Sequence, residues 1–557
     1  MPFSRKNVQV EVPKNSGFSL KHRNSGSLTC GTITPLLVEE VIPNTRVSCK
    51  LNLVHQLPPL ASDTFMNVKV KVEAFFVPFR LLSRSFEAFF CDFPVKTARF
   101  ALPADTGVSA VLTDVSGRMP VFHFADDVPS SIWGAGTLMD YTGCIIDSIQ
   151  YQGGFDFNPA AIEAYHLIWQ EWYRNPKVQN PAFVEDLGLV NPSNTATSLR
   201  VLSMPFTFYR EAATGVADNV VAVFSASNVS TDSVLADGVS IFSLRQRNFG
   251  FDYFTAARPS AQQGASAVIV SPVSGGNAST TIAAIREQNS IQQFRERNNI
   301  TSPRMVDQVK ARYNANLADG VAQRPICIGS ATYDVVTRGV DQTADGSASS
   351  GLQNPFNTVA NQYGRAYGAG SDYIISDFVV NEPGLIFINQ TLVPIATYSS
   401  GIRPYLRRYI ASGSIVEMAN PILQNVGDEP IDASTLDGDV GNVGSVFGFQ
   451  DRYGSFMYHP SEVHGLLRDG QSLSSFVLQR SFGSSPSIGT QFLEIPKNYL
   501  DGVFAVSSGV SGLSAWYDSI IELNLSMPLN EFSIPSLQDP AYEHGQSVNL
   551  NRNGQIF

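Results

Sequence analysis

Two stretches of the chain alternate between apolar and polar residues at every position. The first, MNVKVKVEA, covers residues 66–74, and the second, IELNLSM, covers residues 521–527 and is followed by Pro528. A period of two places the apolar side chains on one face of an extended strand and the polar ones on the other. Each stretch therefore predicts a strand with one buried face, and the proline predicts where the second strand ends.

Four shorter apolar runs predict further strands. They are VSCKLNLV from Val47, SDFVV from Ser376, LIFINQTLVP from Leu385 and SFMYHP from Ser455. The runs occur near the ends and in the middle of the chain, without the regular alternation of strands and helices that marks a parallel sheet. The pattern predicts an all-β protein, an antiparallel β-sandwich with long loop insertions and a few short helices.

Helical spacing is found in three segments. Between Pro159 and Arg174, the apolar residues Ile162, Tyr165, Trp169 and Trp172 recur at intervals of three and four, which predicts an amphipathic helix. The other two predicted helices are TTIAAIREQNSIQQF from Thr280 and LLSRSFEAFF from Leu81.

The composition favours extensive contacts between subunits. Charged residues make up 16% of the 557 residues and aromatic residues 11%, whereas a typical globular chain has roughly 25% charged residues. The buried centres of permanent interfaces are poor in charge and rich in rings. Stretches rich in Gly, Ser, Asn and Ala occur at 194–240, 264–279, 339–371 and 426–446, and their length predicts functional surface loops.

Charge, cysteines and the N-terminus narrow the class of protein. The net charge of −11 argues against a surface that grips nucleic acid throughout, although a local basic patch remains compatible with it. The five cysteines are widely spaced without a C-x-x-C pair, which predicts reduced thiols, as in a protein made in a cytosol. The chain has no apolar signal-peptide core and no apolar run of about 18 residues, so it predicts neither secretion nor a membrane span.

Motifs for catalysis or metal binding are almost wholly missing from the sequence. HPSEVH, at residues 459–464, lacks the H-E-x-x-H spacing that places two histidines on one helical face. An acidic run does not match an EF-hand loop, and a solvated loop is its simpler interpretation; it comprises Asp428, Glu429, Asp432, Asp437 and Asp439. No P-loop, nucleophile-elbow or dinucleotide fingerprint is present. We expect no enzyme activity, no metal and no cofactor.

Two groups of basic residues are candidates for contact with nucleic acid. The first lies in a polar N-terminal segment whose single acid is Glu11, and it comprises Arg5, Lys6, Lys14, Lys21 and Arg23. Such an arm either meets phosphates or is a solvated terminus. The second is IRPYLRRYI, where Arg403, Arg407 and Arg408 stand beside Tyr405 and Tyr409. Guanidinium groups mixed with rings suit single-stranded nucleic acid, and they equally suit a subunit contact.

Eight sequence blocks, spread from His22 to Leu537, occur in the order of a known family. They are HRNSGSLTCGTITPLLVEEVIPNTRVSCKLNLVHQLPPL, AFFVPFRLLSRSFEAFF, YHLIWQEWYRNPKVQNP, FDYFTAARPSAQQG, TIAAIREQNSIQQFRERN, RPICIGS, FGFQDRYGSFMYHPSEVHGLLRDG and SMPLNEFSIPSL. Together they resemble the major capsid protein of gokushovirus-like microviruses, which are small tailless icosahedral phages with a circular single-stranded DNA genome.

The resemblance implies an eight-stranded antiparallel jelly-roll β-sandwich with large insertions. It also implies a T=1 shell of about 60 copies closed by two-, three- and fivefold contacts. The implied partners are the single-stranded DNA genome, the small basic DNA-binding, DNA-pilot and internal scaffolding proteins of the virus, and a receptor on the host cell surface. The implied location is the virion, after assembly in the cytoplasm of a host bacterium.

The candidate residues take their expected roles from this resemblance. The basic residues of both groups would line the interior against DNA. Trp169, Trp172 and Tyr173 on the aromatic helix, with Tyr405 and Tyr409, would contact a neighbouring subunit, because rings anchor interface centres. The aromatic helix could equally cover one edge of the sandwich as core.

The resemblance also suggests how the chain is divided. We expect an N-terminal basic arm at 1–40, the first part of the jelly roll with its inserted helix at 41–182, an exterior loop insertion at 183–247, the remaining jelly roll with long loops at 248–527, and an extended C-terminal arm at 528–557. Gokushovirus-like members carry a long threefold protrusion after FDYFTAARPSAQQG, but here only residues 265–279 separate that block from the next helix. We therefore expect 183–247 to supply much of the exterior relief.

Two other classes of protein share a loop-rich β-sandwich. A polysaccharide-cleaving enzyme needs two carboxylates held in one cleft, which a sequence alone does not reveal. A carbohydrate-binding or adhesive module would normally carry a secretion signal. A carbohydrate-binding or polysaccharide-cleaving protein is thus the alternative to a capsid subunit.

Overall fold

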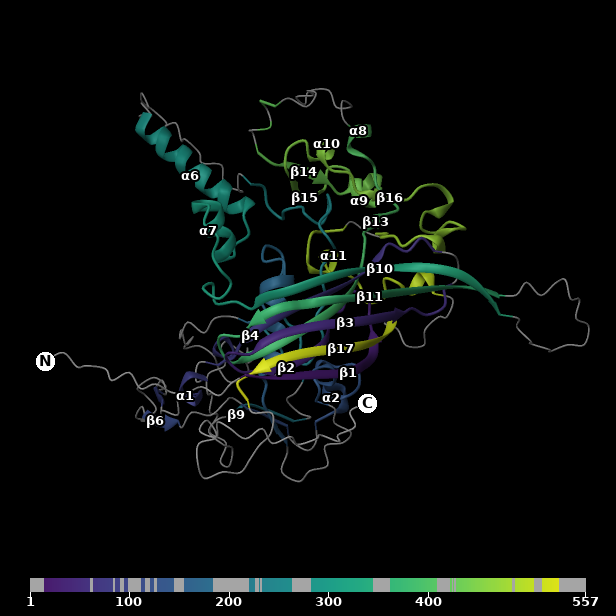
Figure 1. The fold of residues 1–557 in the computed structure, drawn as a ribbon. Coiled ribbons are helices and arrows are strands. Elements are labelled where there is room, and N and C mark those ends of the chain that lie inside the picture. The colour runs from purple at the N-terminus through teal and green to yellow at the C-terminus, as the bar shows by residue number, and fades with distance from the viewer. Residues whose placement is uncertain are drawn as a thin grey trace, which may run out of the picture.

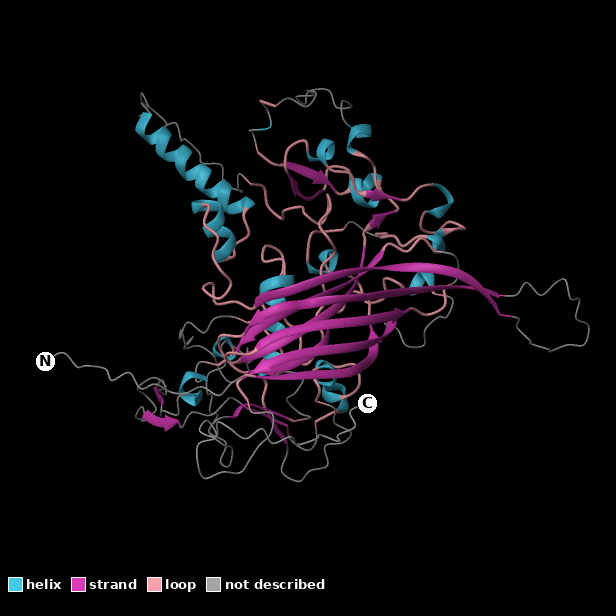
Figure 2. Ribbon diagram, in the orientation of Figure 1, coloured by secondary structure: helices cyan, strands magenta, loops and turns pink. Residues whose placement is uncertain are grey.

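The computed structural model describes the chain from residue 15 to residue 529 with gaps. The gaps are 61–63, 84–85, 91–94, 99–111, 116–120, 125–127, 145–154, 184–219, 226–229, 231–232, 263–281, 344–360, 408–420, 423, 425–426, 483–485 and 505–512. Strands dominate the described part, and helices are few and mostly short (Figure 2). None of the helices in this part is both long and apolar enough to cross a membrane.

Eight antiparallel strands form the main sheet (Figure 1). In chain order they are β1 (Ser16–Leu28), β2 (Thr34–Val41), β3 (Arg46–Gln56), β4 (Val68–Pro78), β10 (Ile326–Thr343), β11 (Asn361–Val379), β12 (Gly384–Pro394) and β17 (Ala515–Met527). Their order in the sheet is β1-β17-β3-β11-β10-β4-β12-β2. Most neighbours in the sheet are therefore distant in the sequence, so the pairing depends on the fold as a whole.

The sheet folds over itself into two layers that share β10. Residues 326–334 of β10 pair with β4, whereas residues 335–343 pair with β11, so β10 passes from one layer to the other. The edge strands also approach each other, because Asn24 of β1 donates a hydrogen bond of 2.8 Å to the carbonyl of Leu36 in β2. The inner faces of both layers share one core. This arrangement is the expected all-β jelly-roll sandwich.

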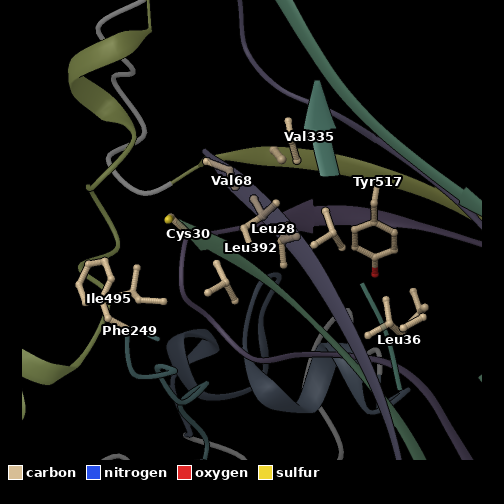
Figure 3. Close-up of a cluster of buried hydrophobic side chains, with 14 of the residues drawn as sticks. Leu28, Cys30, Leu36, Val68, Phe249, Val335, Leu392, Ile495 and Tyr517 are labelled. Atoms are coloured by element: carbon tan, nitrogen blue, oxygen red, sulfur yellow. The ribbon is translucent and has the colours of Figure 1, made fainter. Parts of the chain in front are cut away.

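The shared core contains the apolar positions of the two alternating stretches. Val70 and Val72 of β4 are fully buried, and Ile521 and Leu523 of β17 are at most 1% exposed. Figure 3 shows Cys30 and Leu392 in this core, with Ile495 and Phe249 from the later loops packed nearby. Gly31 has a φ of +70°, and a Cβ there would lie 2.5 Å from Ile495, so only glycine permits this close approach.

The expected strands and helices are mostly confirmed. The predicted strands at 47–54, 385–394 and 521–527 fall within β3, β12 and β17, and those at 66–74 and 376–380 overlap β4 and β11, whose bounds differ by one or two residues. The aromatic helix is α4 (Ala160–Ile168) continued by the π-helix η3 (Trp169–Tyr173). The helix expected from Thr280 is α6 (Ile282–Ile300). The run from Leu81 begins at the last residue of η1 (Phe79–Leu81) and includes α1 (Phe86–Phe90).

Two expectations differ from the structure. SFMYHP is not a strand: its first three residues belong to α10 (Gly454–Met457), which follows Tyr453 in the left-handed conformation at a φ of 65°. The expected arm at 1–40 contains β1 and β2 in its described part. The pattern of β1 is weak because most of its side chains are exposed. Its backbone pairing with β17, from Ser16 to Leu28, is what makes it a strand.

Two long insertions carry the remaining elements. The insertion between β4 and β10 also contains β5 (Val95–Ala98), β6 (Leu112–Val115), β7 (Val121–Phe124), α2 (Ser130–Trp133), α3 (Leu138–Tyr141), β8 (Phe155–Phe157), β9 (Val220–Phe224) and α7 (Met305–Tyr313). The insertion between β12 and β17 contains β13 (Thr397–Tyr398), α8 (Pro404–Arg407), β14 (Glu429–Asp432), α9 (Ser434–Asp437), η5 (Val440–Asn442), β15 (Val446–Gln450), β16 (Ser461–Glu462), η6 (Gly465–Leu467), η7 (Ser474–Phe476), α11 (Thr490–Leu493) and η8 (Asp501–Val503).

The first insertion forms a second core against the outer face of the β4–β12 layer. Phe75 of β4 and Phe387 of β12 belong to this core, together with Tyr165 and Ile168 of α4. Every residue of β12 is buried, since one of its faces meets the shared core and the other meets the insertion. The layer containing β4 and β12 is thus covered on both sides by the chain itself.

Buried histidines predict that the subunit loses stability in acid. His55, 1% exposed, lies 3.0 Å from Gln390, and burial lowers its pKa to about 4, although the contact with Gln390 opposes the shift. As the pH falls, the His55 imidazole is protonated near pH 6.5 in the unfolded chain but only near pH 4 in the folded chain. Between those values stability falls as the pH falls, with a loss of about 2 kcal/mol from His55 at pH 5.

Denaturant unfolding of the unassembled subunit at pH 7 and pH 5 measures this loss. A His55→Gln variant should show a smaller difference between the two pH values. His459→Gln, which removes an exposed histidine, is the matched control and should behave like the parent chain. An unchanged pH dependence in His55→Gln would contradict the assignment.

Candidate functional site

The aromatic helix faces inward within the subunit. Trp169 is 3% exposed and Tyr173 is 9% exposed, and both belong to the core of the first insertion. The Trp169 indole donates a hydrogen bond of 3.1 Å to the carbonyl of Gln246, and the Arg245 guanidinium lies 4.4 Å from the ring centroid. These two rings, expected at a subunit interface, are instead enclosed by their own chain, because the helix is needed to cover the sheet.

Trp172 joins the same helix to the start of β10. Its indole donates a hydrogen bond of 3.0 Å to the carbonyl of Pro325, and its ring packs 5.6 Å from that of Phe75. The Arg324 guanidinium lies 4.5 Å from the Trp172 centroid. The Trp172 ring is only partly buried. It contacts Pro325 at the end of the first insertion and Phe75 of β4, the strand that precedes this insertion.

A polar cluster missed by the sequence reasoning lies beneath these rings. The Arg247 guanidinium donates two hydrogen bonds, of 2.6 and 2.9 Å, to the two oxygens of Glu73, and the Tyr173 hydroxyl donates one of 2.5 Å to the same carboxylate. Burial would raise the pKa of Glu73, but the hydrogen bonds and charge of Arg247 outweigh it and lower that pKa. In the sequence, the alternation of apolar and polar residues stops after Glu73, and an apolar run that includes Phe75 follows. This change was the only local sign that both faces of β4 are covered there.

A second buried cluster occupies the described part of 183–247. Arg245 forms an ion pair with Asp237 and donates a hydrogen bond of 2.8 Å to Nδ1 of His166. His166 Nε2 donates in turn to the carbonyl of Ile241 at 2.6 Å, so the imidazole is neutral with its proton on Nε2. Burial, reinforced by the charge of Arg245, holds the pKa of His166 well below its ordinary value.

The segment expected to form exterior relief is therefore partly interior to the subunit. Leu235 and Phe242 are 2% exposed and Ile241 is fully buried, all within the core of the first insertion. The rest of the expected loop, at 184–219, 226–229 and 231–232, lies outside the described residues. Residues 233–247 pack inward because they supply the partners of α4.

The first basic group is split by the structure. Lys21 and Arg23 lie on β1, where each pairs with an acid of β17: Lys21 with Glu522 at 2.7 Å and Arg23 with Asp518 at 2.6 Å. Their side chains remain 57% and 71% exposed. Arg5, Lys6 and Lys14 lie outside the described residues.

The second basic group is also engaged by acids of its own chain. Arg403 binds Glu462 through Nε at 2.9 and 3.0 Å, and these contacts raise the pKa of its guanidinium. Arg407 on α8 donates to Asp432 at 2.5 Å. Tyr405 is 59% exposed. Arg408 and Tyr409 fall in the undescribed segment 408–420.

Arg403 and Tyr405 line a pocket of about 460 Å³ in the second insertion. Other residues that line it are Tyr253, Phe254, Tyr398, Tyr458, His459, Glu462, His464 and Arg468. The pocket therefore combines several ring faces with the ion pair of Arg403 and Glu462. Chemically, such a site can stack a planar or ring-shaped ligand and hydrogen-bond its edge.

Members of the acidic run have partners within the protein, and two of them, Asp428 and Asp432, pair with arginines. Asp428 pairs with Arg258, and Asp437 accepts hydrogen bonds from the Asp439 amide and the Asn442 side chain. Burial would raise the pKa of Asp432, but hydrogen bonds from Ser434, the Gly444 amide and Arg407 outweigh it and lower that pKa. In the described part of the chain, no three His, Cys, Asp or Glu residues are placed to hold a metal ion.

Comparisons with known proteins agree with this architecture. A family model described as capsid protein (F protein) matches residues 6–534. The chain is 22% identical to capsid protein VP1 of Chlamydia phage 1, over 97% of this chain and 99% of that protein. It is also 22% identical to capsid protein VP1 of Bdellovibrio phage phiMH2K, over 83% and 84% of the two chains. Capsid protein VP1 of Spiroplasma virus 4 is 20% identical, over 95% and 96%.

The family match covers nearly the whole chain, including both insertions and all eight strands of the sheet. An antiparallel jelly roll agrees with the fold expected for such a capsid subunit. The chain therefore belongs to the capsid protein (F protein) family of microviruses, as a structural protein of the virion and not an enzyme.

Proposed function

We propose that this capsid protein closes a T=1 icosahedral shell of about 60 identical copies around a circular single-stranded DNA genome. The observation that carries the proposal is the full-length similarity to capsid proteins VP1, 97% of this chain against 99% of the Chlamydia phage 1 protein. A single jelly roll with two large insertions provides one compact unit with surfaces on several sides. Identical units of this kind can occupy equivalent positions in a closed shell.

The free energy of closure comes mainly from apolar burial between copies. Large apolar side chains remain exposed on the isolated subunit, among them Phe65 at 68%, Phe251 at 88% and Ile422 at 77%. With charged residues at only 16% of the chain, much of its surface suits a permanent interface. The ordinary assignment of such surfaces is contact with neighbouring copies.

Contact with the genome is assigned mainly to the basic residues of the N-terminal segment. The N-terminal Arg5, Lys6 and Lys14 face a single acid in their segment, Glu11, and we assign the main neutralisation of phosphates to them. Lys21, Arg23, Arg403 and Arg407 each have an acidic partner within the chain and contribute less. Arg408 and Tyr409 complete the interior set proposed from the sequence.

The other proposed partners of this capsid protein are further viral proteins and a host receptor. The small basic DNA-binding, DNA-pilot and internal scaffolding proteins of the virus act during assembly in the cytoplasm of the host bacterium. Exterior loops, including the undescribed part of 183–247, contact a receptor on the host surface. The proposed function as a shell protein does not depend on these additional partners.

Expression of the chain, followed by sizing and electron microscopy of the heaviest fraction, tests the shell. Closed particles of one diameter, with icosahedral symmetry and one chain in each asymmetric unit, are the expected result. Particles with more than one chain in each asymmetric unit would exclude T=1. A chain that stays monomeric even when produced with the other proteins of its virus would contradict the proposal.

Salt titration of filled particles tests the role of the N-terminal basic residues. Raised salt should release DNA before it dissociates the shell, because phosphate contacts are screened and apolar contacts are not. Replacing Arg5, Lys6 and Lys14 together by Gln should weaken DNA retention and reduce the slope of log affinity against log salt by about 2.

The matched control replaces Lys21 and Arg23 by Gln, which removes cations already paired with acids of β17. This control should change the slope less for each cation removed, because Lys21 and Arg23 are already partly neutralised by their acidic partners. Equal changes for each cation removed would take the N-terminal residues out of the proposed role. Dissociation of the shell before DNA release would show that charge pairs dominate the subunit contacts.

A further inference from the structure

The helices α6 and α7 form an arm that extends away from the sheet (Figure 1). The arm is held at its base, where Asn299 donates hydrogen bonds of 2.8 and 3.1 Å to the carbonyls of Ala261 and Gln262. Arg304, between the helices, donates to the carbonyls of Gln170 and Arg174 at 3.0 and 2.9 Å. These bonds fix the direction of the arm relative to the covered layer of the sandwich.

The two helices are also joined to each other. Arg312 of α7 donates a hydrogen bond of 2.8 Å to the side chain of Asn298 in α6, and its guanidinium lies 5.1 Å from the Phe294 ring. The arm is therefore a two-helix unit with a defined shape, anchored at one end.

The arm buries no side chain among its described residues. No residue of α7 is buried, and the described side chains of α6, at 286–300, are exposed or half-buried. Apolar residues on the arm are open to solvent: Ile291 36%, Phe294 53%, Ile300 49%, Met305 67% and Tyr313 77%. Helices in proteins depend mainly on burying an apolar face, so the contacts within the subunit leave this arm incomplete.

The charge of the arm is opposite to that of the chain as a whole. Its basic residues are Arg286, Arg295, Arg297, Arg304, Lys310 and Arg312, and its acidic residues are Glu287, Glu296 and Asp307. The complete chain has a net charge of −11, so the surface outside the arm is more acidic still. An arm rich in arginine and exposed rings matches an acidic protein surface with apolar residues, which a second copy of this chain provides.

We infer that the arm formed by α6 and α7 docks onto a neighbouring copy of the chain and is a principal contact of the shell. The inference rests on the proposed assembly into a shell. It adds which element of one copy contacts the next copy. Nucleic acid is the less suitable occupant, since bases could stack on exposed rings but would leave the aliphatic side chains of Ile300 and Met305 in water. A second copy satisfies both the charges and the apolar side chains.

Carbodiimide coupling of Lys310 in mixed-label shells tests the inference. Shells are assembled from equal amounts of ¹⁴N- and ¹⁵N-labelled chains, coupled, digested and analysed by mass spectrometry. Lys310, on the exposed side of α7, should be joined to an Asp or Glu in peptides that carry one label of each kind. A Lys310→Arg variant keeps the charge but loses the amine, so it should assemble normally and lack these peptides.

The outcomes separate the arm from the shell. Closed particles in which Lys310 is coupled only within one label, only to another virion protein, or not at all would overturn the inference and leave the shell intact. If no closed particles form, both the proposed shell and the arm contact fail. Protection of the arm that appears only on adding DNA would assign it to nucleic acid instead.

A double substitution, Met305→Ser with Tyr313→Ser, measures the contribution of the apolar side chains. Both side chains are largely exposed, so the unfolding midpoint of the unassembled subunit should match that of the parent chain. The concentration needed for shell assembly should rise about tenfold or more, because an exposed anchor is lost at every equivalent contact. An unchanged assembly threshold would overturn the inference.

Discussion

The fold depends on a sheet layer that is buried on both faces. In β12 all residues from Gly384 to Pro394 are buried, and in β4 the residues from Ala74 to Pro78 are buried as well. Strands of this kind cannot face water on either side, so one face closes the sandwich and the other requires a cover. The insertion between β4 and β10 is that cover. Its aromatic helix, α4 with η3, packs directly on this layer and shares one core with it.

The cover is fixed in place by buried polar clusters as well as by apolar contact. Glu73 projects from β4 at the point where the strand passes under the insertion, and it binds Arg247 and Tyr173 at once. Arg245 links Asp237 to His166 in the same region. Removing one member of such a cluster leaves the others buried without a partner, which is costly. These clusters therefore specify where the insertion lies on the sheet.

The same division of surfaces explains how one chain serves both its own fold and a shell. The aromatic residues Trp169 and Tyr173 complete the interior, whereas exposed apolar residues gather elsewhere, including the arm of α6 and α7. The paired arginines Arg403 and Arg407 hold loops of the second insertion together beside an aromatic pocket. Interior packing and the proposed contacts with other copies and with the genome thus use different sets of side chains.

The sequence by itself determined the class of the protein and its strongest strands. Local periodicity reports which face of an element is buried. The structure therefore agrees with the strands predicted from the alternation in 66–74 and 521–527 and with the helix predicted from the spacing in 159–174. The resemblance of the sequence blocks determined the family. β1, which has few buried side chains, and SFMYHP, which looked like a strand, were decided by their surroundings.

Only the tertiary structure decided which aromatic and charged residues are free to meet a partner. Trp169 could have been core or interface from its spacing, and the need to cover β4 and β12 made it core. Lys21 and Arg23 looked like part of an arm until β17 supplied Glu522 and Asp518 opposite them. Burial and pairing arise from residues hundreds of positions apart, and no local pattern contains that information.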